Sequence, residues 1–147
     1  MPATAESLYR YLTQYPKEMA SGSEDPETVL DRYFTPDYTF LSDGVSQDRR
    51  RLLAHVRAVR RKAPEADLEI QEALVDGHHV SARYTIRATL KGRRVDTEVY
   101  MFGEMADDGR LSRLDQITRM LKQRPEWSGP GDQGARRPPT TAAAPRP

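Results

Sequence analysis

Four side chains that can hold or move a proton lie in segments that one fold could bring together. His55 follows two leucines in a basic stretch, Asp43 follows a short apolar segment, and Tyr15 and Tyr84 lie in segments with a regular apolar period. An imidazole exchanges protons near neutral pH, a carboxylate can act as a general base, and a tyrosine hydroxyl can stabilise an oxyanion. If the protein is catalytic, these residue types favour acid–base chemistry in which His55 or Asp43 moves a proton and Tyr84 or Tyr15 stabilises an oxyanion, and they imply no metal and no organic cofactor.

Each of these residues also has a plainer interpretation. His55 lies beside the apolar stripe of its segment, where a histidine can simply border the core. Asp43 precedes a glycine, and an aspartate there can bond to the backbone of its own turn. Tyr84, like Tyr38 and Phe40, is of a type that often packs in a core. In a fold with a central pocket, core and pocket wall are the same surface, so these aromatic residues stay candidate ligand contacts.

Three further ionisable residues are weaker candidates. His78 and His79 lie at a hairpin with no third ligand nearby, so we expect no metal site there. Asp115 is either an acid of the pocket or the cross-strand partner of Arg83 or Arg113.

The segment from Val80 to Met120 has the pattern of three antiparallel strands that would position these groups. Residues 80–90 alternate apolar and polar side chains with the two-residue period of a half-buried strand. A tight turn at Lys91 and Gly92 pairs Leu90 with the residue after that turn. The outer face would then oppose Arg87 to Asp96, Thr85 to Glu98, and Arg83 to Tyr100.

The last two strands of this segment are joined by residues 106–109, which are typical of a loop. Pairing Met105 with Arg110 places Thr118 on the apolar face and Arg119 beside Asp96. The same pairing puts three more residues on the apolar face, namely Leu114, Gln116 and Met120.

The first half of the chain predicts helices and two shorter strands. Residues 7–20 carry a helical apolar stripe, which Pro16 should kink or split. A short helix begins at Pro26, and residues 38–41 form a strand. Ser46 can cap a helix over residues 47–62, and residues 67–75 form a strand with a bulge near Ala73.

Composition sets limits on the class of protein. The chain has 147 residues, 37% hydrophobic content, a net charge of +1 and no cysteine. We expect one domain over residues 1–124, a disordered tail over residues 125–147 in which Trp127 could fold back, and a cytoplasmic location. Seven positive charges over residues 49–62 could bind an anionic membrane or nucleic acid. A solvated helix face is the simpler interpretation, so we expect neither partner.

The order of elements resembles the NTF2-like superfamily and, within it, the SnoaL-like proteins. The resemblance covers roughly residues 7–122 and depends on three short motifs: residues 33–38 (YFTPDY), 76–77 (DG) and 108–111 (DGRL). It implies an α+β cone, in which helices pack on the concave face of a curved antiparallel sheet and leave a pocket. It also implies a homodimer through the outer sheet face. The superfamily includes cyclases, isomerases, hydrolases, dehydratases and binding modules, so the fold alone does not settle the function.

Three catalytic patterns of this superfamily match the chain in part. Ketosteroid isomerases resemble it in placing a tyrosine at Tyr15. Their general base would fall at Ser42, with Asp43 one residue later. Their protonated acid would fall at Val99, Tyr100 or Met101. Limonene-epoxide-type hydrolases would match at Arg83, but Thr85 replaces the carboxylate partner. Their second acid, like the aspartate of SnoaL-like cyclases, falls at Thr118 or Arg119.

The sequence therefore predicts a small-molecule-binding, SnoaL-like protein that acts on, or simply binds, a largely apolar organic molecule. The alternative is a non-enzymatic module of the same fold that binds a protein partner or senses a ligand. The predicted pocket wall is Tyr38, Phe40, His55, Tyr84, Val99, Met101, Gln116 and Thr118.

Overall fold

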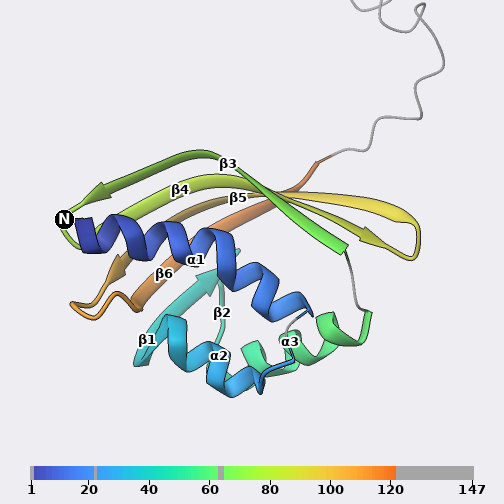
Figure 1. Cartoon of the computed structure of the whole chain (residues 1–147), viewed down its shortest axis with the longest axis horizontal. Coiled ribbons are helices and arrows are strands. Elements are labelled where there is room, and N and C mark those ends of the chain that lie inside the picture. Colours follow the sequence, from blue (N-terminus) through green and yellow to red (C-terminus); the bar gives the residue numbers. More distant parts are fainter. Residues whose placement is uncertain (1, 22, 63–64, 122–147) are drawn as a thin grey trace, which may run out of the picture.

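The computed structural model describes residues 2–21, 23–62 and 65–121, and within them a curved six-stranded sheet has three helices on one side (Figure 1). The strand order is β2-β1-β6-β5-β4-β3. The sheet is mixed rather than antiparallel throughout as predicted, because β1 runs parallel to β6. The predicted tail at 125–147, including Trp127, lies outside the described residues. The elements are α1 (Pro2–Ser21), α2 (Pro26–Tyr33), β1 (Phe34–Ser42), β2 (Val45–Ser46), α3 (Arg49–Lys62), β3 (Glu65–Asp76), β4 (His79–Leu90), β5 (Arg93–Met105) and β6 (Leu111–Met120).

Local signals explain where the helices begin. The Asp25 side chain accepts a hydrogen bond from the backbone of the first turn of α2, whose first residue is Pro26. For α3 the predicted cap at Ser46 is wrong, because Ser46 lies in β2 and the carboxylate of Asp48 accepts from the Arg51 backbone at 2.9 Å. Of the two predicted effects of Pro16, a kink or a split, the split does not occur, since α1 continues through this residue.

The register of β4 and β5 agrees with the sequence pattern. Leu90 lies opposite Arg93, and the alternation continues to the far end of both strands without a shift. Between β5 and β6 the predicted pairing is wrong by two residues, because a shift after Glu104 places Met105 opposite Leu111. From Arg113 to Met120 a two-residue error keeps each side chain on its predicted face, since strand side chains alternate with period two. Leu111 is the exception, because it lies opposite Met105 rather than Glu104 and is buried. The bulge in β3 falls at Gln71 rather than near residue 73.

The core lies between the helices and the concave face of the sheet. Among the least exposed side chains are Val29, Leu30, Val56, Met101, Leu111 and Leu114. Each buried aliphatic side chain of this size stabilises the fold by about 1.5–3 kcal/mol. Rings from α1, α2 and β1 add an aromatic cluster around Phe34, whose ring centre lies 5.6 Å from that of Tyr15 and 5.8 Å from that of Phe40. An aromatic cluster therefore fills the space where α1 and α2 meet β1.

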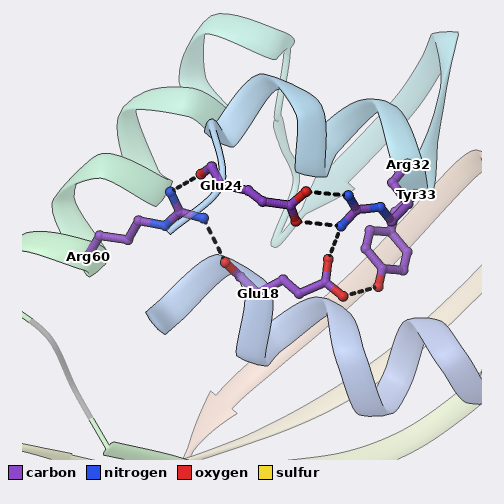
Figure 2. Close-up of polar contacts among 5 residues, drawn as sticks. All are labelled: Glu18, Glu24, Arg32, Tyr33 and Arg60. Atoms are coloured by element: carbon purple, nitrogen blue, oxygen red, sulfur yellow. Dashed lines mark hydrogen bonds and ion pairs between the residues drawn. The ribbon is translucent and has the colours of Figure 1, made fainter. Parts of the chain in front are cut away.

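Five residues at the junction of the three helices form a polar cluster, which we call the helix-junction cluster (Figure 2). Arg32 of α2 makes ion pairs with Glu18 of α1 at 2.5 Å and with Glu24 at 2.7 Å. The Tyr33 hydroxyl donates to the second oxygen of Glu18 at 2.8 Å. Arg60 of α3 donates to the backbone carbonyl oxygens of Glu18, Met19 and Glu24 at 2.7, 3.2 and 2.5 Å. The cluster thus fixes the helices to one another above the sheet.

The outer face of the sheet carries ion pairs and exposed apolar side chains. Arg119 donates to the nearly buried Glu98 at 2.6 Å, and Arg83 and Arg87 contact glutamates of β3. The predicted pairing of Arg119 with Asp96 is wrong, as the two-residue shift requires. Side chains of Tyr100, Phe102 and Ile117 are exposed on this face. The homodimer expected here stays a prediction. In the described chain, no helix is long and apolar enough to cross a bilayer.

Acid should weaken the fold through the outer-face pairs. Hydrogen bonding to Arg119 lowers the pKa of Glu98, so its stabilising effect is present above the unfolded-state value near pH ~4.3 and is lost as the pH falls through the folded-state value. We expect the free energy of unfolding, measured with urea, to fall between about pH 4.5 and 3, and to fall less steeply in Glu98→Gln. Glu6→Gln, at an exposed site on α1, should keep the wild-type slope; identical slopes in all three proteins would contradict this.

Candidate ligand-binding cavity

A cavity of about 580 Å³ lies between α1, α3 and the concave face of the sheet. Its wall is mainly apolar and aromatic, with contributions from α1, α3 and five strands. Buried side chains mark its inner part, and exposed ones mark its mouth at His55, Lys62 and Ala66. The buried lining residues are Tyr11, Met19, Phe40, Leu52, Val56, Tyr84 and Val99.

The hydroxyls of two tyrosines, Tyr11 of α1 and Tyr84 of β4, interact in the inner part of the cavity. Burial raises the pKa of both phenols well above the ordinary value. Burial likewise raises the pKa of Tyr15, whose ring stacks on Tyr11 at 4.9 Å between ring centres. All three phenols therefore stay protonated at physiological pH. Besides Tyr11, the Tyr84 hydroxyl has no hydrogen-bond partner among the described residues, so it can donate to a group in the cavity.

A second polar corner lies where β1 meets β6. The Gln116 side-chain amide donates to the Ser42 hydroxyl at 3.1 Å, and both residues line the cavity beside Thr118. Asp43 lies behind them in the turn after β1, where its two carboxylate oxygens accept from the backbone and the hydroxyl of Thr118 at 2.8 and 2.6 Å. These hydrogen bonds lower the pKa of Asp43. A lowered pKa is the opposite of what a general base near neutral pH needs, and the predicted catalytic role of Asp43 stays a prediction.

The cavity brings together most of the residues predicted to form its wall. Phe40, His55, Tyr84, Val99, Gln116 and Thr118 line it, as does the catalytic candidate Tyr15. Three predicted site residues do not: Asp43 bonds to Thr118, Met101 is buried in the core, and the Tyr38 hydroxyl donates to the Gln47 carbonyl at 3.0 Å. Sequence reasoning missed Tyr11 and Lys62. The four-residue spacing of Tyr11 and Tyr15, which places both on one helix face, was the available signal for the first.

The lining offers hydrogen-bond donors but few groups that can exchange a proton. No carboxylate is found among the described residues that line the cavity. His55 is exposed on α3 at the mouth, so its imidazole is the lining group suited to moving a proton near neutral pH. The geometry is therefore better suited to holding an uncharged, oxygen-bearing group than to carboxylate-driven catalysis.

The other histidines lie far along the sheet from this cavity. His78 contacts Asp107 at 2.9 Å, and His79 contacts Glu104 at 3.3 Å, each in an exposed pair. In the described part of the chain, no group of three or more His, Asp or Glu residues could hold a metal ion.

Comparison with known proteins agrees with this architecture. The uncharacterized protein C11D3.04c of Schizosaccharomyces pombe is 29% identical over 126 residues, which cover 83% of this chain and 91% of the relative. IdmH of Streptomyces antibioticus, a proposed polyketide cyclase, is 16% identical with a TM-score of 0.59, over 78% of this chain and 91% of IdmH. The designed NTF2-fold protein NT-9 is 23% identical with a TM-score of 0.52, over 76% and 84% of the two chains.

A curved sheet with helices on its concave face and a cavity between them defines an NTF2-like α+β protein, as the sequence predicted. The SnoaL-like domain family matches residues 13–114, and the chain belongs to this family. The structural likenesses establish the fold and leave the ligand to be argued from the cavity itself.

Proposed function

We propose that this protein binds a small, largely apolar organic molecule in the cavity, and that the Tyr84 hydroxyl donates a hydrogen bond to an oxygen of that molecule. The observation that carries the proposal is the Tyr11–Tyr84 pair on a buried and mainly apolar part of the wall. Besides Tyr11, the Tyr84 hydroxyl has no hydrogen-bond partner in the described part of the chain, which leaves it able to donate to a ligand.

The size and composition of the cavity support binding. Sites for small molecules typically have volumes of about 300–1,000 Å³, with apolar walls and a few placed polar groups. The present cavity of about 580 Å³ lies within that range. The tyrosine pair comes from α1 and β4, whereas the polar corner of Ser42, Gln116 and Thr118 comes from β1 and β6. A ligand with oxygens at two separated positions would satisfy both.

Family membership and the likeness to a proposed polyketide cyclase support an organic ligand with carbonyl or hydroxyl groups. A cyclisation, isomerisation or dehydration of that ligand would use His55 to move the proton and Tyr84 to stabilise an oxyanion. Neither step needs a metal ion or an organic cofactor. Binding alone is the function that the geometry supports best, because the lining lacks the carboxylate on which such reactions usually depend.

Fluorescence titration with N-phenyl-1-naphthylamine, a neutral apolar dye, tests the proposal. We expect saturable binding at one site per chain, and displacement of the dye by both tetralin and 1-tetralone, which differ by one carbonyl group. Tyr84→Phe should weaken displacement by tetralone about tenfold, because a hydrogen bond in an apolar site contributes about 1.5 kcal/mol, and should leave tetralin unchanged.

The two parts of the proposal fail separately. Absence of saturable dye binding would refute a ligand cavity. Equal responses of tetralone and tetralin to Tyr84→Phe, with binding intact, would refute the donor role of Tyr84. Because burial leaves the Tyr84 hydroxyl with one partner, the phenylalanine variant should fold like the wild type, which circular dichroism would verify.

A further inference from the structure

The mouth of the cavity carries positive charge without a counterion. Lys62, the last residue of α3, lines the cavity and is exposed. Among the described residues, no carboxylate lies within ion-pair distance of its ammonium group, and none lines the cavity. His55, two helical turns earlier, reaches the same opening from the same helix. The exposed end of the cavity is therefore positively charged, while its inner part is mainly apolar.

The nearest acidic residues along the chain do not neutralise this end. β3 begins with Glu65, Ala66 and Asp67, of which Ala66 faces the cavity. Glu65 and Asp67 line an adjoining hollow of about 300 Å³ together with Arg87 and Arg94, and Ala66 lines both that hollow and the cavity. The Asp67 carboxylate also accepts from the Leu68 backbone at 2.9 Å. These acids thus lie beside other cations.

The rest of α3 strengthens the positive potential at the mouth. Residues 49–62 contain seven lysines and arginines and no acidic residue. Two of them are engaged, because Arg49 pairs with Asp31 at 2.7 Å and Arg60 bonds to backbone carbonyls. Arg57 and Arg61 are exposed and have no ion-pair partner in the described part of the chain. Unpaired charges of one sign beside a low-dielectric cavity attract ligands of the opposite sign.

We infer that the ligand is an amphipathic organic anion, whose apolar body fills the cavity and whose anionic group lies beside Lys62. This inference rests on the proposed function and adds a carboxylate, sulfonate or phosphate to the ligand at the end opposite the tyrosine pair. The anionic group stays in contact with water at the mouth, so the ligand keeps part of its hydration while gaining the attraction of the ammonium group. Neutral molecules of the same shape bind by their apolar body alone.

Two dyes that differ by one sulfonate test the inference. 8-Anilinonaphthalene-1-sulfonate is N-phenyl-1-naphthylamine with an added anionic group, and both fluoresce in apolar surroundings. We expect the sulfonate to bind wild type more tightly than the neutral dye does. Lys62→Gln should weaken sulfonate binding about three- to tenfold, the range for a partly exposed ion pair, and leave the neutral dye within twofold.

Arg57→Gln is the matched control, because it removes the same charge from an exposed site on α3 that does not line the cavity. We expect it to change neither affinity by more than about twofold. The inference of an anionic ligand would be refuted if Lys62→Gln did not weaken binding of the sulfonate dye, or if Lys62→Gln and Arg57→Gln weakened it equally. Binding of the neutral dye in that case would still support the cavity as a ligand site. Absence of binding of both dyes would overturn the proposed function itself.

Discussion

Arg60→Met is expected to lower the free energy of unfolding by about 2 kcal/mol, since hydrogen bonds to a charged group contribute about 1.5–3 kcal/mol and this site is partly exposed. The Arg60 guanidinium donates to the backbone carbonyls of Glu18, at the end of α1, and of Glu24, before α2 (Figure 2). It also donates to the backbone carbonyl of Met19. Terminal helix carbonyls have no partner within their own helix. Methionine keeps the apolar stem but donates to none of them. Urea denaturation would measure the loss.

Arg57→Met is the control for this prediction. Arg57 lies one turn earlier on the same helix, is exposed and has no ion-pair partner among the described residues, so its replacement should change stability by less than about 0.5 kcal/mol. Arg60→Lys should recover part of the loss, because an ammonium group keeps the charge but lacks the planar fork that reaches several oxygens. Equal stability of the Arg57 and Arg60 variants would show that the carbonyl contacts do not hold the helices together.

The same contacts also determine the shape of the cavity. Met19 and Ala20 line it, directly after the Glu18 carbonyl that Arg60 holds. Loosening the end of α1 therefore displaces part of the wall. We therefore expect the Arg60 guanidinium, which does not itself line the cavity, to affect both stability and the affinity for the proposed ligand.

The features that sequence reasoning predicted correctly are those set by local periodicity. Alternation over residues 80–90 put Tyr84 inward and Arg83 outward, and the turn at Gly92 fixed the β4–β5 register. The helical stripe of α3 likewise placed Val56 in the core and His55 beside it. In each case, the residue pattern of one element and of the element next to it in the chain is sufficient for the prediction.

The features that the sequence did not reveal depend on contacts between distant residues. Asp43 finds its partner Thr118 seventy-five residues later, so its lowered pKa is invisible in the sequence around it. The register of β5 and β6 depends on a shift after Glu104, and no residue type in the sequence indicates that shift. Arg60 is one of seven cations on α3, and its role follows only from where α1 ends. Such contacts are fixed by the packing of whole elements.

Ala88→Trp is expected to weaken binding of N-phenyl-1-naphthylamine nearly a hundredfold. Ala88 lies on β4 and lines the cavity, so an indole there would occupy space that the ligand needs. A ligand that loses contact with roughly 100 Å² of apolar wall loses about 2.5 kcal/mol at about 25 cal/mol per Å². The fold should tolerate the change, because the cavity has room for the ring and strands favour aromatic residues.

Thr89→Trp is the matched control, at the next residue of the same strand and on its opposite, exposed face. It adds an indole of the same size outside the cavity, so dye affinity should remain within twofold of wild type. If Ala88→Trp and Thr89→Trp both bound the dye like the wild type, with unchanged circular dichroism, the dye would lie elsewhere. The cavity between α1, α3 and the sheet would then not be the ligand site, because a side chain that fills a true site competes with the ligand for the same space.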